Sequence, residues 1–232
     1  MKIVTINGQN HKGSSYTMGR MFAEQLAEPE DITEFFLPKD MPHFCLGCYK
    51  CIEDETACPF WQQKKVILDA LEQADVFVFT TPNYCMAPSA PMKSLLDFLF
   101  DCWMVHRPKE WMFFKRAAIF STSAGAGCAQ PIKVINDSLT YWGVPQVISY
   151  GLPVHAKNWQ EVDQKTKQRI TKKIAKMAKR YQTEKPPKVG FKTKALFGFM
   201  GFLHKKGWDS SPAEQSYWQE RGWLNGKKPW NR

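Results

Sequence analysis

The feature that most limits how this chain folds is residues 76–79, the run Val-Phe-Val-Phe, which has no alternating polar position. A short, wholly apolar run is typical of a strand buried on both faces of a parallel sheet. Other short, mostly apolar runs lie at residues 2–6, 32–37, 117–120 and 147–148. A parallel sheet needs helices on both of its faces, so these runs predict an α/β protein.

Apolar residues at helical spacing fill the intervals between these runs. The helices are expected within residues 18–26, 66–75, 88–99, 132–143 and 160–181. Pro82 is expected to stop the central strand, and Gly143 to end the fourth helix. Five strands alternating with five helices predict a doubly wound, flavodoxin-like sheet in the order 2-1-3-4-5.

The chain divides by charge and composition into a domain and an extension. Residues 1–183 are expected to form the flavodoxin-like domain, and residues 184–232 a C-terminal extension that begins with a Pro-containing linker. Residues 157–232 hold 19 Lys and Arg against 6 Asp and Glu, whereas residues 1–156 hold 13 against 16. This last third of the chain is interpreted either as a solvated basic helix and tail or as a contact for an anionic surface.

The extension is rich in aromatic residues: Phe191, Phe197, Phe199, Phe202, Trp208, Tyr217, Trp218, Trp223 and Trp230. We expect them to pack across the core or onto a second subunit, which makes a homo-oligomer such as a dimer the expected assembly. A peripheral membrane contact is the second interpretation, since Phe and Trp beside Lys suit lipid headgroups. No nucleic-acid recognition motif accompanies them, and no nucleic-acid partner is expected.

The expected compartment is the cytoplasm. No run reaches the roughly 18 apolar residues of a membrane span. The first residues, MKIVTING, lack the apolar core and cleavage site of a signal peptide. The seven cysteines are therefore interpreted as thiols or metal ligands before disulfides.

Three loops are expected at the carboxyl edge of the sheet, where ligands bind in such folds. Residues 8–17 lead directly into a helix N-terminus, whose free N–H groups and dipole favour an anion. Residues 82–90 bring a tyrosine, backbone amides and a sulfur beside this point, where a planar heteroaromatic ring can stack. Residues 121–129 are small enough for the backbone to approach a ligand. Each loop alone is also compatible with ordinary packing or a helix cap.

Taken in order, these loops resemble those of the NADPH-dependent FMN reductase branch of the flavodoxin-like proteins, over roughly residues 1–155. Gln9 stands where that family has Ser, and His11 where it has Arg. The segment Pro82-Asn83-Tyr84 matches the family's Pro-x-Tyr loop against the flavin ring, and residues 123–127 loosely match its Gly-rich loop. The resemblance implies FMN as the cofactor, with contacts from Gln9, His11, Ser14, Ser15, Tyr16, Thr17, Pro82, Asn83, Tyr84, Cys85, Met86, Ser123, Ala124 and Gly125.

The same resemblance implies an enzyme in which NAD(P)H is the co-substrate and donates a hydride to the flavin. The electron acceptor is then a quinone, a metal ion, a free flavin, another small electrophile or a protein. The cofactor carries the reactivity, so no side chain is assigned as a general acid or base. Cys85 is interpreted either as a thiol beside the flavin or as a buried, inert cysteine.

Four cysteines lie within fourteen residues: Cys45, Cys48, Cys51 and Cys58, in the pattern C-x2-C-x2-C-x6-C. Thiolates at such short spacing can surround a metal centre, whereas zinc more often takes two separated pairs. The pattern is similar to that of iron–sulfur flavoproteins, and this resemblance implies a [4Fe–4S] cluster near FMN. The competing interpretations are free thiols, a disulfide formed on oxidation, or a loop without a cluster, as in many FMN reductase relatives.

Three functions follow from these observations. The first is an FMN-dependent NAD(P)H oxidoreductase, and the second is an electron carrier with FMN and an iron–sulfur cluster. The third is a flavodoxin-like module without redox chemistry, whose basic tail binds an anionic surface.

Overall fold

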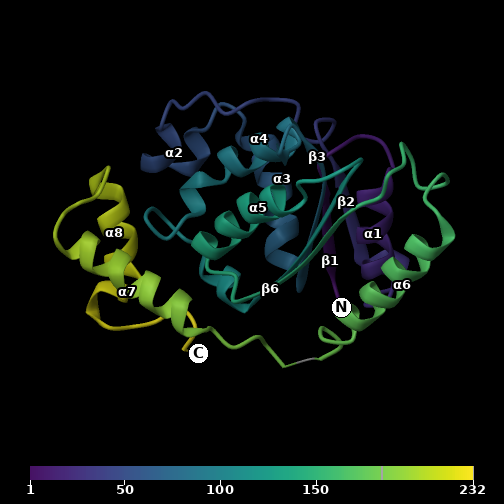
Figure 1. Ribbon diagram of the computed structural model, residues 1–232. Helices are drawn as coiled ribbons and strands as arrows, with labels where there is room; N and C mark the ends of the chain where they lie inside the picture. The colour runs from purple at the N-terminus through teal and green to yellow at the C-terminus, as the bar shows by residue number, and fades with distance from the viewer. Residues whose placement is uncertain (184, 232) are drawn as a thin grey trace.

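A parallel β-sheet lies at the centre of the computed structural model, which describes residues 1–183 and 185–231 (Figure 1). The strands are β1 (Ile3–Asn7), β2 (Ile32–Phe36), β3 (Val76–Tyr84), β4 (Ala87–Pro88), β5 (Arg116–Ser123) and β6 (Gln146–Pro153). The α-helices are α1 (Ser14–Ala23), α2 (Lys50–Glu53), α3 (Trp61–Gln73), α4 (Ala90–Phe98), α5 (Ala129–Trp142), α6 (Gln164–Ala178), α7 (Phe191–Lys205) and α8 (Pro212–Glu220). Short 3-10 helices are η1 (Pro29–Asp31), η2 (Glu55–Ala57), η3 (Phe100–Cys102), η4 (Glu110–Phe114) and η5 (Trp223–Asn225). Helices α1 and α6 cover one face of the sheet, and α3, α4 and α5 cover the other (Figure 1).

The long strands are all parallel and follow the order β2-β1-β3-β5-β6. The two-residue strand β4 pairs antiparallel with the end of β3 and stands outside this path. With β4 set aside, the long strands follow the order 2-1-3-4-5 expected from the sequence. The flavodoxin-like, doubly wound fold is therefore confirmed.

The central strand β3 runs further than the sequence predicts. Pro82 does not stop it, because β3 continues to Tyr84 and Pro82 pairs with Thr122 of β5. The neighbouring strand β1 ends at Asn7, opposite Thr80, so beyond that point β3 has a long neighbour on one side only. A proline is tolerated at such an edge because no partner strand needs its missing N–H.

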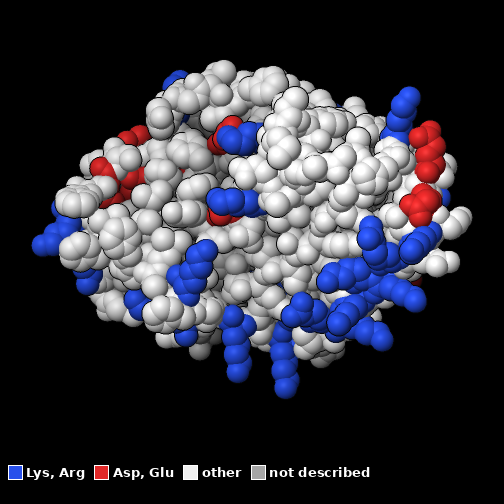
Figure 2. Space-filling model, viewed as in Figure 1, with Lys and Arg blue, Asp and Glu red and all other residues white. Residues whose placement is uncertain are grey.

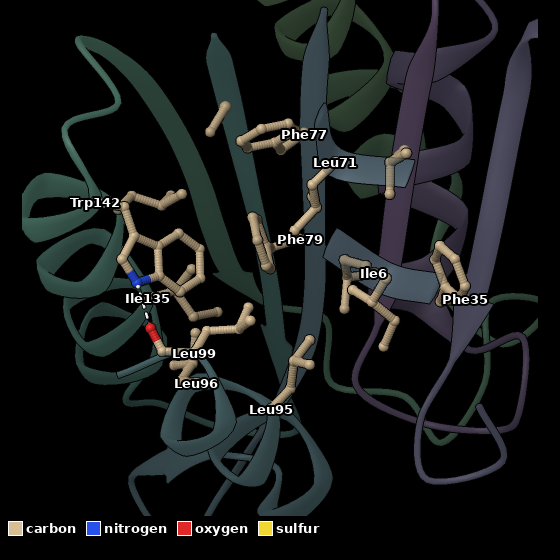
Figure 3. Close-up of a cluster of buried hydrophobic side chains, with 14 of the residues drawn as sticks. Ile6, Phe35, Leu71, Phe77, Phe79, Leu95, Leu96, Leu99, Ile135 and Trp142 are labelled. Carbon is tan, nitrogen blue, oxygen red and sulfur yellow. Dashed lines mark hydrogen bonds between the residues drawn. The ribbon is translucent and has the colours of Figure 1, made fainter. Parts of the chain in front are cut away.

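The apolar run in β3 packs on both faces of the sheet, as predicted. Phe77 and Phe79 lie in a core with residues of α3, α4 and α5, while Val76 and Val78 lie in a second core with residues of α1 and α6. Figure 3 shows the first core, in which the indole N–H of Trp142 donates to the carbonyl of Leu99 at 3.2 Å. A buried indole whose N–H is satisfied fixes α5 against the end of α4.

Helix α1 packs closely on the sheet at Gly19. A Cβ atom at this position would lie 2.3 Å from Cγ2 of Thr80, so a larger residue does not fit without movement. In the same layer, the Tyr181 hydroxyl donates to the carbonyl of Ala117 at 2.8 Å, which fastens the chain after α6 to β5. The Gly19 contact holds α1 close to β3 near Thr80.

The C-terminal extension packs on the sheet domain of the same chain. Its helices α7, α8 and η5 form a third apolar cluster with Met104 and Phe113, which precede β5. Glu184, the first residue predicted for the extension, lies outside the described residues. No helix within the described residues is long and apolar enough to cross a membrane.

Residues 106–109 contact the extension on one side and, on the other, residues 45–58, which contain four cysteines and are called here the Cys-rich segment. On the extension side, Trp218 donates to the carbonyl of His106 at 2.8 Å and Tyr217 to that of Pro108 at 2.7 Å. On the other side, Arg107 donates to the carbonyl of Cys51 and Lys109 pairs with Glu55. This short stretch therefore joins three parts of the molecule.

Candidate functional site

A cavity of about 360 Å³ opens at the carboxyl edge of the sheet, between the segments that follow β1, β5 and β6 and the end of β3. Its volume is within the range of small-molecule and cofactor sites, and its position is where doubly wound sheets bind ligands. The cavity is lined by Asn7, Gln9, His11, Gly13, Ser14, Ser15, Tyr16, Thr80, Pro82, Asn83, Tyr84, Thr122, Ser123, Ala124, Val154, Ala156 and Lys157.

One end of this cavity has the donors of an anion site. Helix α1 begins here, and its N-cap residue Gly13 has no side chain to accept from the free N–H groups of the first turn. Ser14 and Ser15 add hydroxyl groups at the same place, and the Ser15 hydroxyl shares a 2.6 Å hydrogen bond with that of Thr122. Free N–H groups at the positive end of a helix dipole, together with hydroxyl donors, suit a phosphate.

Gly8 holds the first loop against the sheet. Its N–H donates to the carbonyl of Thr80 at 2.7 Å, and its own carbonyl accepts from the Ser89 hydroxyl at 2.6 Å. A Cβ atom on Gly8 would lie 2.6 Å from the Ser89 oxygen and 3.1 Å from the Thr80 carbonyl oxygen. The close approach of this loop to β3 therefore requires glycine.

Replacing Gly8 with Ala is expected to destabilise the protein by about 1–3 kcal/mol, the usual cost of forcing a methyl group into a packed site. Urea unfolding followed by circular dichroism measures the effect. Gly125→Ala is the matched control, because a Cβ atom at Gly125 would meet no atom within 4 Å. Equal midpoints for the two variants would contradict the close packing of Gly8.

The other end of the cavity has a wall made by the β3–β4 hairpin and the loop after β5. Asn83 joins these two parts, because its side-chain N–H donates to the carbonyl of Ala126 at 2.7 Å. The other side-chain atom, Oδ1 of Asn83, is buried and has no donor among the described residues. A buried acceptor without a donor is unfavourable unless a ligand supplies one. Tyr84, at the rim, presents a half-exposed aromatic ring beside it.

The turn of this hairpin is built from Cys85 and Met86, with φ values of 50° and 62°. Both residues therefore occupy the left-handed region that residues other than glycine seldom adopt. Met86 also extends over the third loop, since a Cβ atom on Gly127 would lie 2.5 Å from its sulfur. Backbone strain beside a cavity is typical of functional loops, and here it fixes the shape of the rim.

Tyr16 supplies a hydroxyl group that stays protonated at neutral pH. Burial, and after it the carboxylate of Glu34, raise the pKa of Tyr16 above its usual value. Lys12 opposes this shift, and its ammonium lies 5.5 Å from the centre of the Tyr16 ring. Tyr16 is therefore a hydrogen-bond donor or acceptor in the cavity, and not an anion.

Ten of the fourteen ligand contacts expected from the sequence line this cavity; Thr17, Cys85, Met86 and Gly125 do not. The structure departs most clearly from the prediction at Thr17. Its hydroxyl donates to the carbonyl of Gly13 at 3.1 Å, one turn back in its own helix, and is therefore occupied away from the cavity. Cys85, Met86 and Gly125 belong to the two loops that form the wall, but lie outside its lining.

The cavity also contains residues that the sequence analysis missed: Asn7, Gly13, Thr80, Thr122, Val154, Ala156 and Lys157. Lys157 is the most informative, because it adds a cation to the lining. It follows β6, whose carboxyl end lies at the same edge of the sheet as those of β1, β3 and β5. Ligands bind beyond the carboxyl ends of the strands in such folds. This rule predicted the other three loops, and it applies equally to the segment after β6.

The four cysteines of the Cys-rich segment line one small cavity of about 20 Å³, whose other walls include Phe60, Phe98 and Phe100. No three His, Cys, Asp or Glu side chains within residues 1–183 and 185–231 are arranged to hold a metal ion. The cluster expected at Cys45, Cys48, Cys51 and Cys58, in which each thiolate binds a different metal atom, stays a prediction.

A buried ion pair lies beneath the Cys-rich segment. Lys64 and Asp101 are 0% and 2% exposed, and the Lys64 ammonium lies 2.7 Å from both carboxylate oxygens. Burial is the largest single influence on the pKa of Lys64 and acts to lower it. The charge of Asp101, its hydrogen bond to Lys64 and the nearby Cys102 and Cys51 together outweigh burial, so the pKa is raised and this ammonium stays charged. Burial, and after it the charge of Asp101, raise the pKa of Cys51 to about 11, which keeps that thiol protonated at neutral pH.

The residues at the carboxyl edge fit FMN, the cofactor that the sequence resemblance implies. The donors at the start of α1 suit its phosphate. The unpartnered Oδ1 of Asn83 suits an N–H group of its ring system, and the Tyr84 ring provides a flat neighbour. Lys157, which also lines the cavity, adds an ammonium that suits an anion.

Comparison with known sequences gives two matches. The profile of the NADPH-dependent FMN reductase family matches residues 1–158. An iron–sulfur flavoprotein of Methanocaldococcus jannaschii is 30% identical over 99 residues, which cover 42% of this chain and 51% of that protein. The chain therefore spans about half the length of the curated relative that it matches.

Solved structures share the fold. An FMN-dependent NADH-azoreductase from Bacillus anthracis aligns with a TM-score of 0.57 at 13% identity, over 79% of this chain and 100% of that one. An NAD(P)H:quinone oxidoreductase from Methanothermobacter marburgensis aligns with a TM-score of 0.58 at 12% identity, over 80% of this chain and 98% of that one. At these identities the likeness shows the fold alone. The family profile matches residues 1–158, which is more than half of the chain, and the chain therefore belongs to the NADPH-dependent FMN reductase family.

Proposed function

We propose that this protein takes electrons from NAD(P)H and delivers them, through FMN, to a small, flat electrophile such as a quinone. One observation carries the proposal: the cavity combines phosphate donors at the start of α1 with an unpartnered buried acceptor, Asn83 Oδ1, at its other wall. The two ends of FMN, a phosphate and a ring with N–H groups, need these two kinds of partner.

Each part of the cavity has one task in this proposal. The N–H groups of Ser14, Ser15 and Tyr16 bind the phosphate, and Gly8 keeps their loop against the sheet. Asn83 accepts a hydrogen bond from the ring and so fixes its orientation. Bound there, FMN would supply the chemistry of hydride and electron transfer between the nicotinamide and the acceptor. The protein binds, orients and shields the reacting groups.

The proposed acceptor is flat because the rim of the cavity is aromatic and apolar. Tyr84 is 49% exposed and Met86 58% exposed, both in the hairpin that forms the wall. Such side chains stack on conjugated molecules but offer few ligands to a hydrated metal ion. The names of the two structural neighbours above, an azoreductase and a quinone oxidoreductase, also refer to conjugated acceptors.

The test uses the full chain loaded with FMN, with a water-soluble quinone as acceptor and oxygen excluded. We expect bound flavin with absorption bands near ~370 and ~450 nm, and oxidation of NADPH or NADH that depends on the quinone. Failure to bind FMN would remove the cofactor from the proposal. Binding without quinone-dependent oxidation of either nicotinamide would remove the acceptor class.

A second candidate function is electron transfer through FMN and a [4Fe–4S] cluster. The observation that favours it is the single apolar cavity lined by Cys45, Cys48, Cys51 and Cys58. These cysteines would hold the cluster as thiolates, and its surrounding Phe side chains would exclude water. The matched relative of M. jannaschii is named an iron–sulfur flavoprotein.

Iron and sulfide analysis of protein purified without oxygen tests this second candidate. About four irons per chain are expected, and Cys48→Ser and Cys58→Ser are each expected to lower the iron content. Cys85→Ser is the control, because Cys85 is a free cysteine outside that cavity. Protein without iron, even after reconstitution with iron and sulfide, would exclude the cluster and leave the first candidate untouched.

A further inference from the structure

Helix α7 is apolar on two faces, and only one of them is buried. The inner face places Phe197 and Met200 in the cluster beneath the extension. The outer face carries Phe191, Phe199 and Phe202, which are 87%, 55% and 51% exposed. These three residues stand at positions i, i+8 and i+11 and so share one side of the helix. A run of large exposed aromatic residues of this kind marks a contact surface.

The exposed aromatic residues on the outer face of α7 extend over most of the helix, from Phe191 to Phe202. Gly198 lies between the aromatic positions, and a Cβ atom there would meet nothing within 4 Å. Trp208, just after the helix, is 73% exposed and lengthens the apolar surface. We call this surface, formed by Phe191, Phe199, Phe202 and Trp208, the aromatic face. Its shape is a convex ridge and not a groove for a peptide.

Basic residues border the aromatic face and continue from it to α6. In Figure 2 the Lys and Arg side chains follow the lower edge of the molecule, from α6 past the linker to α7, while the acidic side chains lie above them. The exposed basic residues are Lys165, Arg169, Lys172, Lys173, Lys176, Lys179, Arg180, Lys185, Lys188, Lys192, Lys194, Lys205 and Lys206.

The basic residues of this edge form no ion pairs among residues 1–183 and 185–231. The basic residues of the sheet domain are often paired, as Lys65 is with Asp69 and Lys93 with Asp97. By contrast, none of the ion pairs found among the described residues uses a Lys or Arg after residue 156. The edge therefore presents an uncompensated positive field.

We propose that this edge docks on a membrane surface that contains anionic phospholipids, with the aromatic face at the level of the headgroups. Exposed Phe and Trp beside Lys match the headgroup region in polarity, and the basic residues of α6 and the linker match its negative charge. A second copy of the chain is a poor occupant, because it would bring a basic edge against a basic edge. A nucleic acid would use the basic residues but would leave a convex ridge of Phe side chains in water.

The proposed orientation leaves the cofactor cavity open. The sheet runs from the lower edge, where β1 begins, towards the loops that line the cavity (Figure 1). The C-terminal end of α6 and the linker lie at this lower edge, so this part of the docking edge is at the end of the strands away from the cavity (Figure 1). Nicotinamide and acceptor reach the cavity from water in the docked protein. This proposal does not depend on the proposed function, because it involves none of the residues that line the cavity.

Co-sedimentation with lipid vesicles tests the proposal. The full FMN-loaded chain is mixed with vesicles of phosphatidylcholine alone, or of phosphatidylcholine with phosphatidylglycerol. We expect binding to the anionic vesicles only, with an affinity that falls as the salt concentration rises. Trp208 is expected to shift its emission to shorter wavelength on binding, and this shift should be absent in Trp208→Phe.

Two sets of variants separate the apolar from the electrostatic contribution. Phe191→Ser, Phe199→Ser and Phe202→Ser together are expected to weaken binding at least about tenfold, because three apolar side chains no longer leave water. Lys192→Glu, Lys194→Glu and Lys205→Glu together are also expected to cost at least about tenfold. All six positions are exposed, so the fold should persist.

Matched controls come from the sheet domain. Val66→Ser changes an exposed apolar residue of α3, and Lys39→Glu with Lys133→Glu reverses two exposed charges outside the docking edge. These controls should bind vesicles like the unchanged protein. The proposal is overturned if anionic vesicles are not bound, if the Phe variant binds them as well as the unchanged protein, or if a single-stranded oligonucleotide binds more tightly than the vesicles.

Discussion

Replacing Lys64 with Met is expected to lower the free energy of unfolding by about 3–5 kcal/mol. The substitution leaves the Asp101 carboxylate, which is 2% exposed, without the ammonium that lies 2.7 Å from both of its oxygens. A buried charge without a partner is among the most destabilising changes that one substitution makes. Urea unfolding measures the loss, at a fixed FMN concentration because bound cofactor adds to apparent stability.

Two further variants show whether burial is the cause. Lys65→Met removes the neighbouring lysine, whose pair with Asp69 is about half exposed, and should cost no more than about 1 kcal/mol. Lys64→Met combined with Asp101→Leu should recover much of the stability, because it removes both buried charges. Similar unfolding midpoints for Lys64→Met and Lys65→Met would show that the first pair is not buried in solution.

The pH dependence of this contribution follows from the direction of the shift. The pKa of Lys64 is raised in the folded protein, so its contribution is fully present below the pKa of an unfolded lysine, about 10.4. The contribution is lost only as the pH rises through the higher folded value. The difference in stability between the unchanged protein and the double variant Lys64→Met, Asp101→Leu, which has no buried carboxylate left to titrate, should therefore stay constant from pH 6 to about pH 9.

Removing the hydroxyl groups of both Ser14 and Ser15 is expected to weaken FMN binding at least about 100-fold. Both serines line the cavity at the start of α1, and a hydrogen bond to a charged group contributes about 1.5–3 kcal/mol. The Ser15 hydroxyl can accept from the Thr122 hydroxyl and keep its own proton for the phosphate. The double variant Ser14→Ala, Ser15→Ala keeps the backbone N–H groups, so weak binding should remain. Titration of the apoprotein with FMN, followed by the flavin fluorescence, gives the two dissociation constants.

Thr17→Ala is the control for this loss. It also removes a hydroxyl from the first turns of α1, but that hydroxyl donates to the carbonyl of Gly13 and does not line the cavity. Its affinity for FMN should stay within about threefold of the unchanged value, which corresponds to less than about 0.7 kcal/mol. An equally large loss in Thr17→Ala would place the phosphate elsewhere on the helix.

Local patterns were enough to predict the order of the strands and most of the cavity. The run at residues 76–79 has no polar position because Phe77 and Phe79 face one core and Val76 and Val78 the other. Gly143 ends α5 because it adopts a φ of 92°, a conformation that glycine takes without strain. In both cases the local residues determine the local structure, and contacts with distant parts of the chain do not change it.

The failures depend on contacts between distant parts of the chain. Pro82 continues β3 because β1 has already ended beside it, and the sequence of β3 does not reveal this. Lys64 lies in a helix with many polar residues, and its burial depends on Asp101, 37 residues away. Ser15 and Thr17 both carry hydroxyl groups near the start of α1. The 3.6-residue repeat of a helix places their side chains on different sides of α1, and the Thr17 hydroxyl donates to the carbonyl of Gly13 instead of lining the cavity.

The double contact made by residues 106–109 has a consequence for how chains of this kind change length in evolution. The carbonyls of His106 and Pro108 hold the extension, while Arg107 and Lys109, which alternate with them, hold the Cys-rich segment. One inserted residue would move the later partners by up to ~3.8 Å relative to the earlier ones. Relatives that keep both the Cys-rich segment and the extension should therefore show no insertions or deletions at 106–109. The stretch 185–190, which is neither helix nor strand, should vary freely in length.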